Sequence, residues 1–257
     1  MASPTHASDA TPSVDGRLYP EGGQREHAVL REALAKHRLF VVLAAVFVTF
    51  LVLGDVTGGK AFLLPYFGRL SGPVSVGMIF FPMTFLLTDV VNDFYGRKGA
   101  QFLTAVGAGM ATLSYFALTI STSLVTHRDS YFSDAEYTKI FGGSTRLFAA
   151  SLVAYLAGQL LDIAVFQFWK RLTRNRYLWL RATGSTLISQ LLDTITVNAL
   201  FWGTLANKEV AWISDKIQRE YVLKIVIAVA LTPLIYALHG AISHWLQLKP
   251  EAILKPK

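Results

Sequence analysis

Three aspartates stand inside segments of the chain that are otherwise apolar enough to cross a lipid bilayer. They are Asp89, Asp162 and Asp193. An ionisable side chain at membrane depth costs about 2.5 kcal/mol or more on insertion scales, and such residues typically line a polar cavity or a pathway. Two of them end the same short motif, Gln159-Leu-Leu-Asp162 and Gln190-Leu-Leu-Asp193. The sequence therefore predicts binding chemistry inside a membrane.

The paired amide and carboxylate indicate the kind of ligand that this chemistry suits. In a helix, residues three apart share a face, so each glutamine lies beside its aspartate. A carboxylate accepts from two adjacent N–H donors and an amide both donates and accepts, which together match the edge of a guanine-like base. Phe166 continues the face of Gln159 and Asp162 and offers a ring for stacking. The alternative is that these groups only join two helices by hydrogen bonds.

A second polar face is expected where Asp89, Asn92 and Asp93 recur at helical spacing. Residues at positions i, i+3 and i+4 lie on one side of a helix. Asp93 is close in sequence to Arg97 and Lys98, so it is expected at the membrane surface, paired with those bases. Asp89 lies one turn deeper and is the better candidate for a site.

Four other residues carry predictions in the second and last apolar segments. Lys224 either extends to the membrane surface or points inward and neutralises an aspartate. Pro82 removes a backbone hydrogen bond, so it either exposes polar backbone near a substrate or makes an ordinary kink. His239 and His244 are five residues apart and do not share a helical face, so no metal site is expected.

The composition is that of a polytopic membrane protein. Of 257 residues, 53% are hydrophobic and 16% are charged, with a mean hydropathy of +0.41. Soluble domains average about 25% charged residues. The chain has no cysteine, which excludes disulfides and thiolate catalysis. Residues Gly54 to Lys60 resemble part of a phosphate-binding loop, but Ala61 replaces the Ser or Thr that would hold Mg²⁺, so no cofactor is expected.

Apolar segments near the length of a bilayer predict an all-α fold of six transmembrane helices. Of the Lys and Arg residues in the flanks and loops, 14 fall on one side and 8 on the other. The richer side, which holds both termini, is expected in the cytoplasm. Topology thus explains the basic residues, and no nucleic-acid partner is expected. The segments are Leu39–Leu53, Pro73–Val91, Phe102–Leu124, Leu147–Trp169, Gly184–Leu205 and Tyr221–Leu246.

The rest of the chain is expected to lie outside the bilayer. Residues 1–26 are rich in small, polar and charged side chains and predict a disordered cytoplasmic tail. Residues 27–248 then form the transmembrane domain and residues 249–257 a second cytoplasmic tail. The longest external connection, residues 125–145, is expected to be a solvated loop. Its aromatic residues leave open the alternative that it folds over the mouth of the protein.

Four short motifs resemble those of one known family. They are Phe81-Pro-Met-Thr-Phe-Leu-Leu-Thr-Asp89 with Phe94-Tyr-Gly96, Gly158-Gln-Leu-Leu-Asp162 with Val165-Phe166, Ser185-Thr-Leu with Asp193-Thr194, and Tyr221 to Lys224 with Pro233. In this order, over residues 37–247, they resemble the queuosine precursor transporter family, also called the vitamin uptake transporter-like family. The resemblance implies a multi-pass importer of the 7-deazaguanines preQ0 and preQ1 in the inner membrane, and not an enzyme.

The resemblance also implies which residues bind the substrate. The family positions correspond to Asp89, Gln159, Asp162, Ser185, Asp193 and Lys224. Asn92, Gln190 and Phe166 join them because they lie on the same helical faces. Proton symport is one mechanism that paired Asp and Lys residues permit, and facilitated diffusion is another.

Several alternatives remain open from the sequence alone. The chain could be a substrate-capture subunit that needs a separate ATPase partner, or, in a different class, an intramembrane aspartyl enzyme. Acidic motifs on the second helix of each half are compatible with a 3+3 inverted repeat. Small residues at Ala105–Gly109 and Ala154–Gly158 permit close helix contacts, within one chain or in a homodimer.

Overall fold

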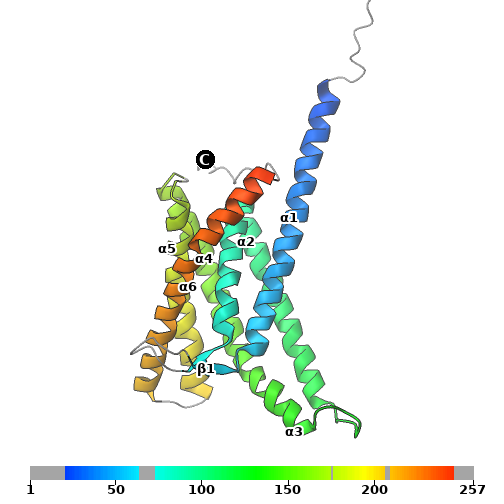
Figure 1. Ribbon diagram of the computed structural model, residues 1–257, viewed down its shortest axis with the longest axis vertical. Helices are drawn as coiled ribbons and strands as arrows, with labels where there is room; N and C mark the ends of the chain where they lie inside the picture. The colour runs from blue at the N-terminus through cyan, green and yellow to red at the C-terminus, as the bar shows by residue number, and fades with distance from the viewer. Residues whose placement is uncertain (1–20, 64–72, 175, 206–208, 246–257) are drawn as a thin grey trace, which may run out of the picture.

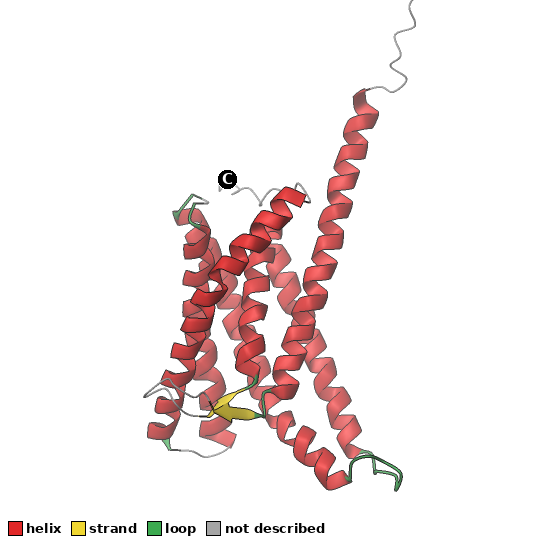
Figure 2. Cartoon of the chain, viewed as in Figure 1, coloured by secondary structure: helices red, strands yellow, loops and turns green. Residues whose placement is uncertain are grey.

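The computed structural model describes residues 21–63, 73–174, 176–205 and 209–245, and these residues are almost entirely helical (Figure 2). Four helical stretches are long and apolar enough to cross a membrane. Within a bilayer no water satisfies the backbone, so an apolar chain hydrogen-bonds within itself as a helix. The all-α prediction is confirmed. The four stretches are Val29–Thr57, Gly77–Ser123, Ser151–Leu172 and Val210–His244.

Helix α1 spans Glu21–Thr57 and is longer at both ends than the sequence predicted. The predicted disordered tail of residues 1–26 is wrong for residues 21–26, which are helical, and residues 1–20 lie outside the described residues. At its other end α1 continues past Leu53 through Gly54 and Asp55, and it ends just before the glycine pair at 58 and 59.

A small antiparallel hairpin joins α1 to α2. Strand β1, Ala61–Leu63, pairs with β2, Pro73–Ser75, with Ala61 opposite Ser75. The Ser75 hydroxyl donates to the carbonyl of Gly58 at 2.7 Å and accepts from the backbone N–H of Gly77 at 3.1 Å. These bonds fix the end of α1 against the start of α2.

Helix α2, Gly77–Ser123, contains a reversal of the chain at Gly96. Gly96 has φ 67° and ψ −172°, a conformation that is essentially restricted to glycine. The residues before it (77–95, the first arm) rise through the bundle and those after it (97–123, the second arm) return beside them (Figure 1). Phe40 of α1 contacts both arms, through Tyr95 and Phe102. The two predicted segments are thus the two arms of one helical hairpin.

The second half of the chain follows with three long helices. A short helix α3, Asp134–Tyr137, and a π-helical turn η2, Thr138–Gly142, lead into α4, Gly143–Leu172. Helix α5, Leu178–Asn198, continues through the π-helical turn η3, Ala199–Leu205, and α6 is Val210–Trp245. The start of α1 and the end of α6 lie at the same end of the bundle (Figure 1).

Small residues let the helices approach closely where the polar side chains gather. A Cβ on Gly107 would lie 2.5 Å from the Tyr155 hydroxyl and 2.6 Å from the Phe47 ring. A Cβ on Gly158 of α4 would lie 3.4 Å from Cβ of Asp193 on α5. Glycine at these positions therefore brings α1, α2, α4 and α5 together, as small residues do in membrane bundles.

Candidate functional site

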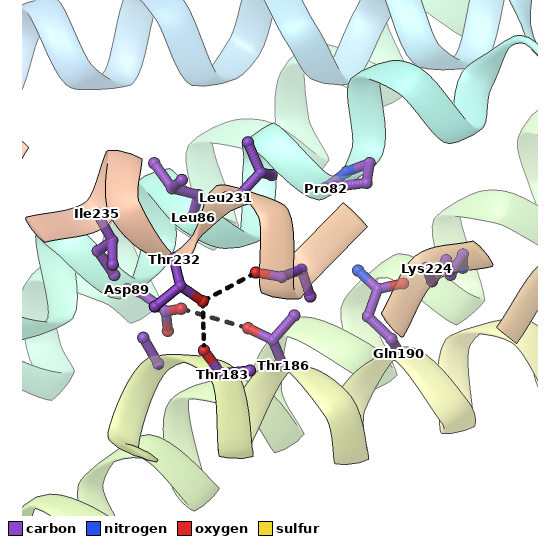
Figure 3. Close-up of a pocket in the computed structure, with 12 residues that line it drawn as sticks. Pro82, Leu86, Asp89, Thr183, Thr186, Gln190, Lys224, Leu231, Thr232 and Ile235 are labelled. Atoms are coloured by element: carbon purple, nitrogen blue, oxygen red, sulfur yellow. Dashed lines mark hydrogen bonds between the residues drawn. The ribbon is translucent and has the colours of Figure 1, made fainter. Parts of the chain in front are cut away.

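A small pocket opens between the first arm of α2, α5 and α6 (Figure 3). Its wall is mostly apolar, with a few polar groups from each helix. It is lined by Pro82, Leu86 and Asp89 of α2, by Ala182, Thr183, Thr186 and Gln190 of α5, and by Lys224, Ala228, Leu231, Thr232 and Ile235 of α6.

Asp89 is the carboxylate of this pocket. It is 2% exposed, and α5 supplies its hydrogen-bond donors. The Thr186 hydroxyl donates to Oδ2 at 3.3 Å, and the Ser185 hydroxyl lies 3.5 Å from Oδ1 (Figure 3). Pro82, two helical turns earlier, also lines the pocket, which places the proline and the carboxylate of α2 at one cavity.

Asp162 and Gln159 lie on α4, behind the pocket wall, and neither is exposed. The Ser189 hydroxyl of α5 donates to Oδ1 of Asp162 at 2.9 Å. Oδ2 of Asp162 and both polar atoms of the Gln159 amide have no hydrogen-bond partner among the described residues. Asp162 is close enough to Asp89 for their charges to interact. Asp162 thus makes the predicted contact between helices, and both residues keep polar atoms that no described residue hydrogen-bonds.

Gln190, in the pocket wall, also has a buried amide whose polar atoms are not hydrogen-bonded by the described residues. It is 2% exposed, and neither its Oε1 nor its Nε2 has a partner in the described part of the chain. Its amide extends from α5 toward α6 (Figure 3). A buried amide without partners loses the free energy of its hydrogen bonds to water, so each such group needs an explanation. A ligand that both donates and accepts would supply the missing bonds.

Lys224 points inward and pairs with Asp193. The distance from Nζ to Oδ2 is 2.7 Å, and the two side chains are only 8% and 16% exposed. Lys224 also lines the pocket, whereas Asp193 lies outside its lining, against Gly158 of α4. The inward alternative is therefore confirmed, and the alternative that Lys224 extends to the membrane surface is wrong.

Asp93 is buried and its partners differ from the prediction. It is 1% exposed, and Arg97 and Lys98 are exposed to the outside. Its partners come instead from three other helices, because it faces the bundle interior. Lys170 Nζ of α4 lies 3.2 Å from Oδ1, Arg181 Nη1 of α5 lies 3.0 Å from Oδ1, and His239 Nε2 of α6 lies 3.1 Å from Oδ2. The four residues, here called the Asp93 cluster, tie four helices together.

Three other predicted site residues lie near the pocket without lining it. Ser185 is buried and reaches Asp89, as described above. Asn92 is buried against α4, where it accepts from Gln167 Nε2 at 2.6 Å. Phe166 is fully buried, and the guanidinium of Arg181 lies 5.5 Å from its ring centroid. Of the nine candidate residues, the structure places Asp89, Gln190 and Lys224 in the pocket wall.

The sequence did not single out three buried polar residues near the site. Thr186 and Ser189 hold the two carboxylates, and their spacing from Ser185 on one helix was the available signal. Asp55 of α1 is buried and accepts from the Ser151 hydroxyl of α4 at 2.7 Å. Asp55 follows the first apolar run directly, so a longer segment would have included it.

Comparison with known families decides what kind of protein carries this pocket. The family model described as "Putative vitamin uptake transporter" matches residues 75–238. That stretch is more than half of the chain and contains every residue of the pocket wall.

The chain belongs to this vitamin uptake transporter family. Together with its apolar helices, this makes it a multi-pass membrane protein and a transporter, and not an enzyme. The predicted family resemblance is confirmed.

Curated relatives of this chain match it over about half or more of their own length. "Probable queuosine precursor transporter" of Bacillus subtilis (strain 168) is 31% identical over 165 residues, which cover 63% of this chain and 70% of the relative. "Queuosine precursor transporter" of Escherichia coli (strain K12) is 32% identical over 128 residues, 49% of this chain and 54% of the relative. No solved structure matches the chain.

Proposed function

We propose that this protein imports queuosine precursors, the 7-deazaguanine bases preQ0 and preQ1, across the inner membrane into the cytoplasm. The family and the names of its relatives support a transporter for this class of small molecule. The pocket between α2, α5 and α6 is the proposed binding site. Uptake proceeds by secondary transport or facilitated diffusion.

One observation carries the choice of a base as substrate, namely the unpartnered amide of Gln190 in the pocket wall. The lactam edge of a deazaguanine presents N1–H as a donor and O6 as an acceptor. A glutamine amide matches both, with Oε1 accepting and Nε2 donating. Binding therefore satisfies both orphan atoms of Gln190 at once, whereas an apolar ligand would leave them unpaired at a cost of about 1–3 kcal/mol each.

The other predicted site residues surround this contact in two layers. In the proposal, Asp89, with Thr186, receives a donor from the substituted side of the base, and the ammonium of Lys224 faces the same cavity. Gln159, Asp162, Ser185, Asn92 and Phe166 form the layer behind. Asp193 sets the position of Lys224 through their ion pair. The pocket wall thus comes from α2, α5 and α6, and α4 contributes to the layer behind it.

We place six membrane spans in this chain, with both termini in the cytoplasm. The spans are α1, the two arms of α2, α4, α5 with η3, and α6. Two observations support this topology. Lys and Arg are concentrated on the side of the termini. The start of α1 and the end of α6 also lie at one end of the bundle (Figure 1). The first arm of α2 and α5, which carry the acidic motifs, run in opposite directions, as a 3+3 inverted repeat requires.

The test is the queuosine content of tRNA in cells that neither make a deazaguanine precursor nor carry an importer of their own. The protein and its Gln190→Leu variant are expressed, and preQ0 or preQ1 is supplied at nanomolar concentration. We expect the wild type to restore queuosine, and we expect Gln190→Leu to lower uptake of both bases tenfold or more, because hydrogen-bonding sites discriminate strongly. Asp215→Asn, on the exposed face of α6, is the control and keeps full uptake.

Failure to restore queuosine, with the protein verified in the membrane, would refute autonomous import. Restoration only after an ATPase partner is co-expressed would instead identify a substrate-capture subunit. Equal uptake by Gln190→Leu and the wild type would leave import intact but remove Gln190 from the site.

A further inference from the structure

Two buried carboxylates at the pocket lack the cationic partners that other buried acids in this protein have. Asp93 is surrounded by Lys170, Arg181 and His239, and Asp193 pairs with Lys224. Among the described residues, no Lys, Arg or His forms an ion pair with Asp89 or Asp162, whose hydrogen-bond donors are hydroxyls. Removing a charge from water without a counter-charge is costly, so this pair is neutralised either by a proton or by a cation from outside the chain.

One member of the pair is placed where a ligand can reach it, and the other lies behind it. Asp89 lines the pocket, and Asp162 lies directly behind it and within electrostatic reach. Oδ2 of Asp162 has no hydrogen-bond donor in the described part of the chain, although the residue is fully buried. An unpartnered, buried acceptor beside a cavity indicates a binding contact that the protein by itself does not complete.

We propose that Asp89 and Asp162 form a cation subsite that selects substrates with a positively charged amine. The inference rests on the proposed function for the identity of the base and adds the charge of its substituent. An aminomethyl group, as in preQ1, is protonated and brings three N–H donors and one positive charge. A nitrile, as in preQ0, brings neither. The subsite therefore makes this transporter selective for the aminomethyl base.

The spacing of the two contacts fits one molecule. Asp89 accepts from Thr186, and Gln190 is four residues further along α5. Four residues of α-helix rise about 6 Å. In a 7-deazaguanine, the substituent on C7 lies on the same side as O6, one bicyclic ring away from N1–H. A base whose lactam edge contacts Gln190 can therefore place its C7 substituent at Asp89 (Figure 3).

The test compares the two bases on one protein. Uptake of preQ1 and preQ0 is measured into membrane vesicles for the wild type, Asp89→Asn, Asp162→Asn and the surface control Asp215→Asn, with and without Na⁺. The wild type is expected to prefer preQ1 by about tenfold or more, the usual gain for a hydrogen bond to a charged group. Either variant of the pair is expected to lose this preference, because its uptake of preQ1 falls by a larger factor than its uptake of preQ0.

Four outcomes would overturn the inference, and they are separable from failure of the proposed function. Equal uptake of the two bases by the wild type excludes selection by charge, even if a variant fails to fold. An equal loss of preQ1 and preQ0 uptake in Asp89→Asn would mean that the pair contacts the ring of the base or only stabilises the fold, and does not select the charged substituent. Uptake that requires Na⁺ in the wild type and not in the variants assigns the subsite to an inorganic cation. Uptake of neither base by the wild type refutes the proposed function and, with it, this subsite.

Discussion

The pair of Lys224 and Asp193 gives the sharpest test of the structure, because the same helix carries a matched control. Replacing Lys224 with Met keeps most of the side-chain volume and leaves the Asp193 carboxylate buried without a counter-charge. At the 2.7 Å separation of Nζ and Oδ2, the attraction is about 6 kcal/mol for an effective dielectric constant of 20. Removing one partner of a buried pair typically lowers the free energy of unfolding by about 3–5 kcal/mol, because the remaining charge is left buried and uncompensated.

The exposed pair of Arg219 and Asp215 has the same separation, 2.7 Å, but lies at the surface of α6. Arg219→Met is therefore expected to change the free energy of unfolding by less than about 1 kcal/mol. The assay is thermal unfolding of the purified protein in detergent, with the double variant Lys224→Met/Asp193→Asn as the third sample. The double variant should recover most of the stability lost in Lys224→Met, since no unpaired charge remains.

Two results would refute the reasoning about this pair. One is a Lys224→Met protein as stable as Arg219→Met, which would mean that Asp193 reaches water when Lys224 is absent. The other is a double variant no more stable than Lys224→Met alone, which would mean that the lysine stabilises the helix by packing and not by charge.

Three further predictions concern other parts of the chain. Gly96→Ala should destabilise the protein by about 1–3 kcal/mol because Gly96 has φ 67°, while Gly109→Ala, at an open helical position, should be neutral or stabilising in the same thermal assay. Asp93→Asn should lower the free energy of unfolding by about 3–5 kcal/mol, since it leaves the buried cations of Lys170 and Arg181 without a carboxylate. A variant that unfolds in detergent at the same temperature as the wild type would contradict the role of the cluster. The Ser133 backbone N–H and hydroxyl donate to Glu136 and lower the pKa of its carboxyl below the ordinary 4.5. The contact therefore stabilises α3 fully above pH 4.5, and this stabilisation is lost as the pH falls through the lowered pKa of Glu136. Carboxyl NMR should show the pKa of Glu136 rise toward its ordinary value in Ser133→Ala, and no change there would contradict the capping contact.

The sequence predicted the helical elements because membrane helices are set by composition over about 20 residues. Every predicted segment falls within the described helices apart from its ends, and the chain reverses at Gly96 between the two segments that α2 joins. The ends were less predictable. Helix α1 extends into a polar stretch from Glu21, where apolar content gives no signal, and side-chain composition alone suggested disorder.

The site was predictable in its residue types and not in its pairings. Asp89, Gln190 and Lys224 were found because polar groups in apolar helices are costly. The pairing of each acid with a particular cation depends on how the helices are rotated and packed. Local sequence does not encode that arrangement. Asp93 was therefore assigned to its sequence neighbours, although its partners lie on α4, α5 and α6, and the alternatives for Lys224 needed the position of Asp193.

The Asp93 cluster has a consequence for the direction in which the pocket opens. Asp93 lies one turn beyond Asp89, Arg181 directly precedes Ala182 and His239 lies one turn beyond Ile235, so the cluster covers the pocket on the side of the chain termini. A molecule that leaves on that side must first separate these ion pairs. The free energy of parting these four helices would then add to the barrier for passage on that side.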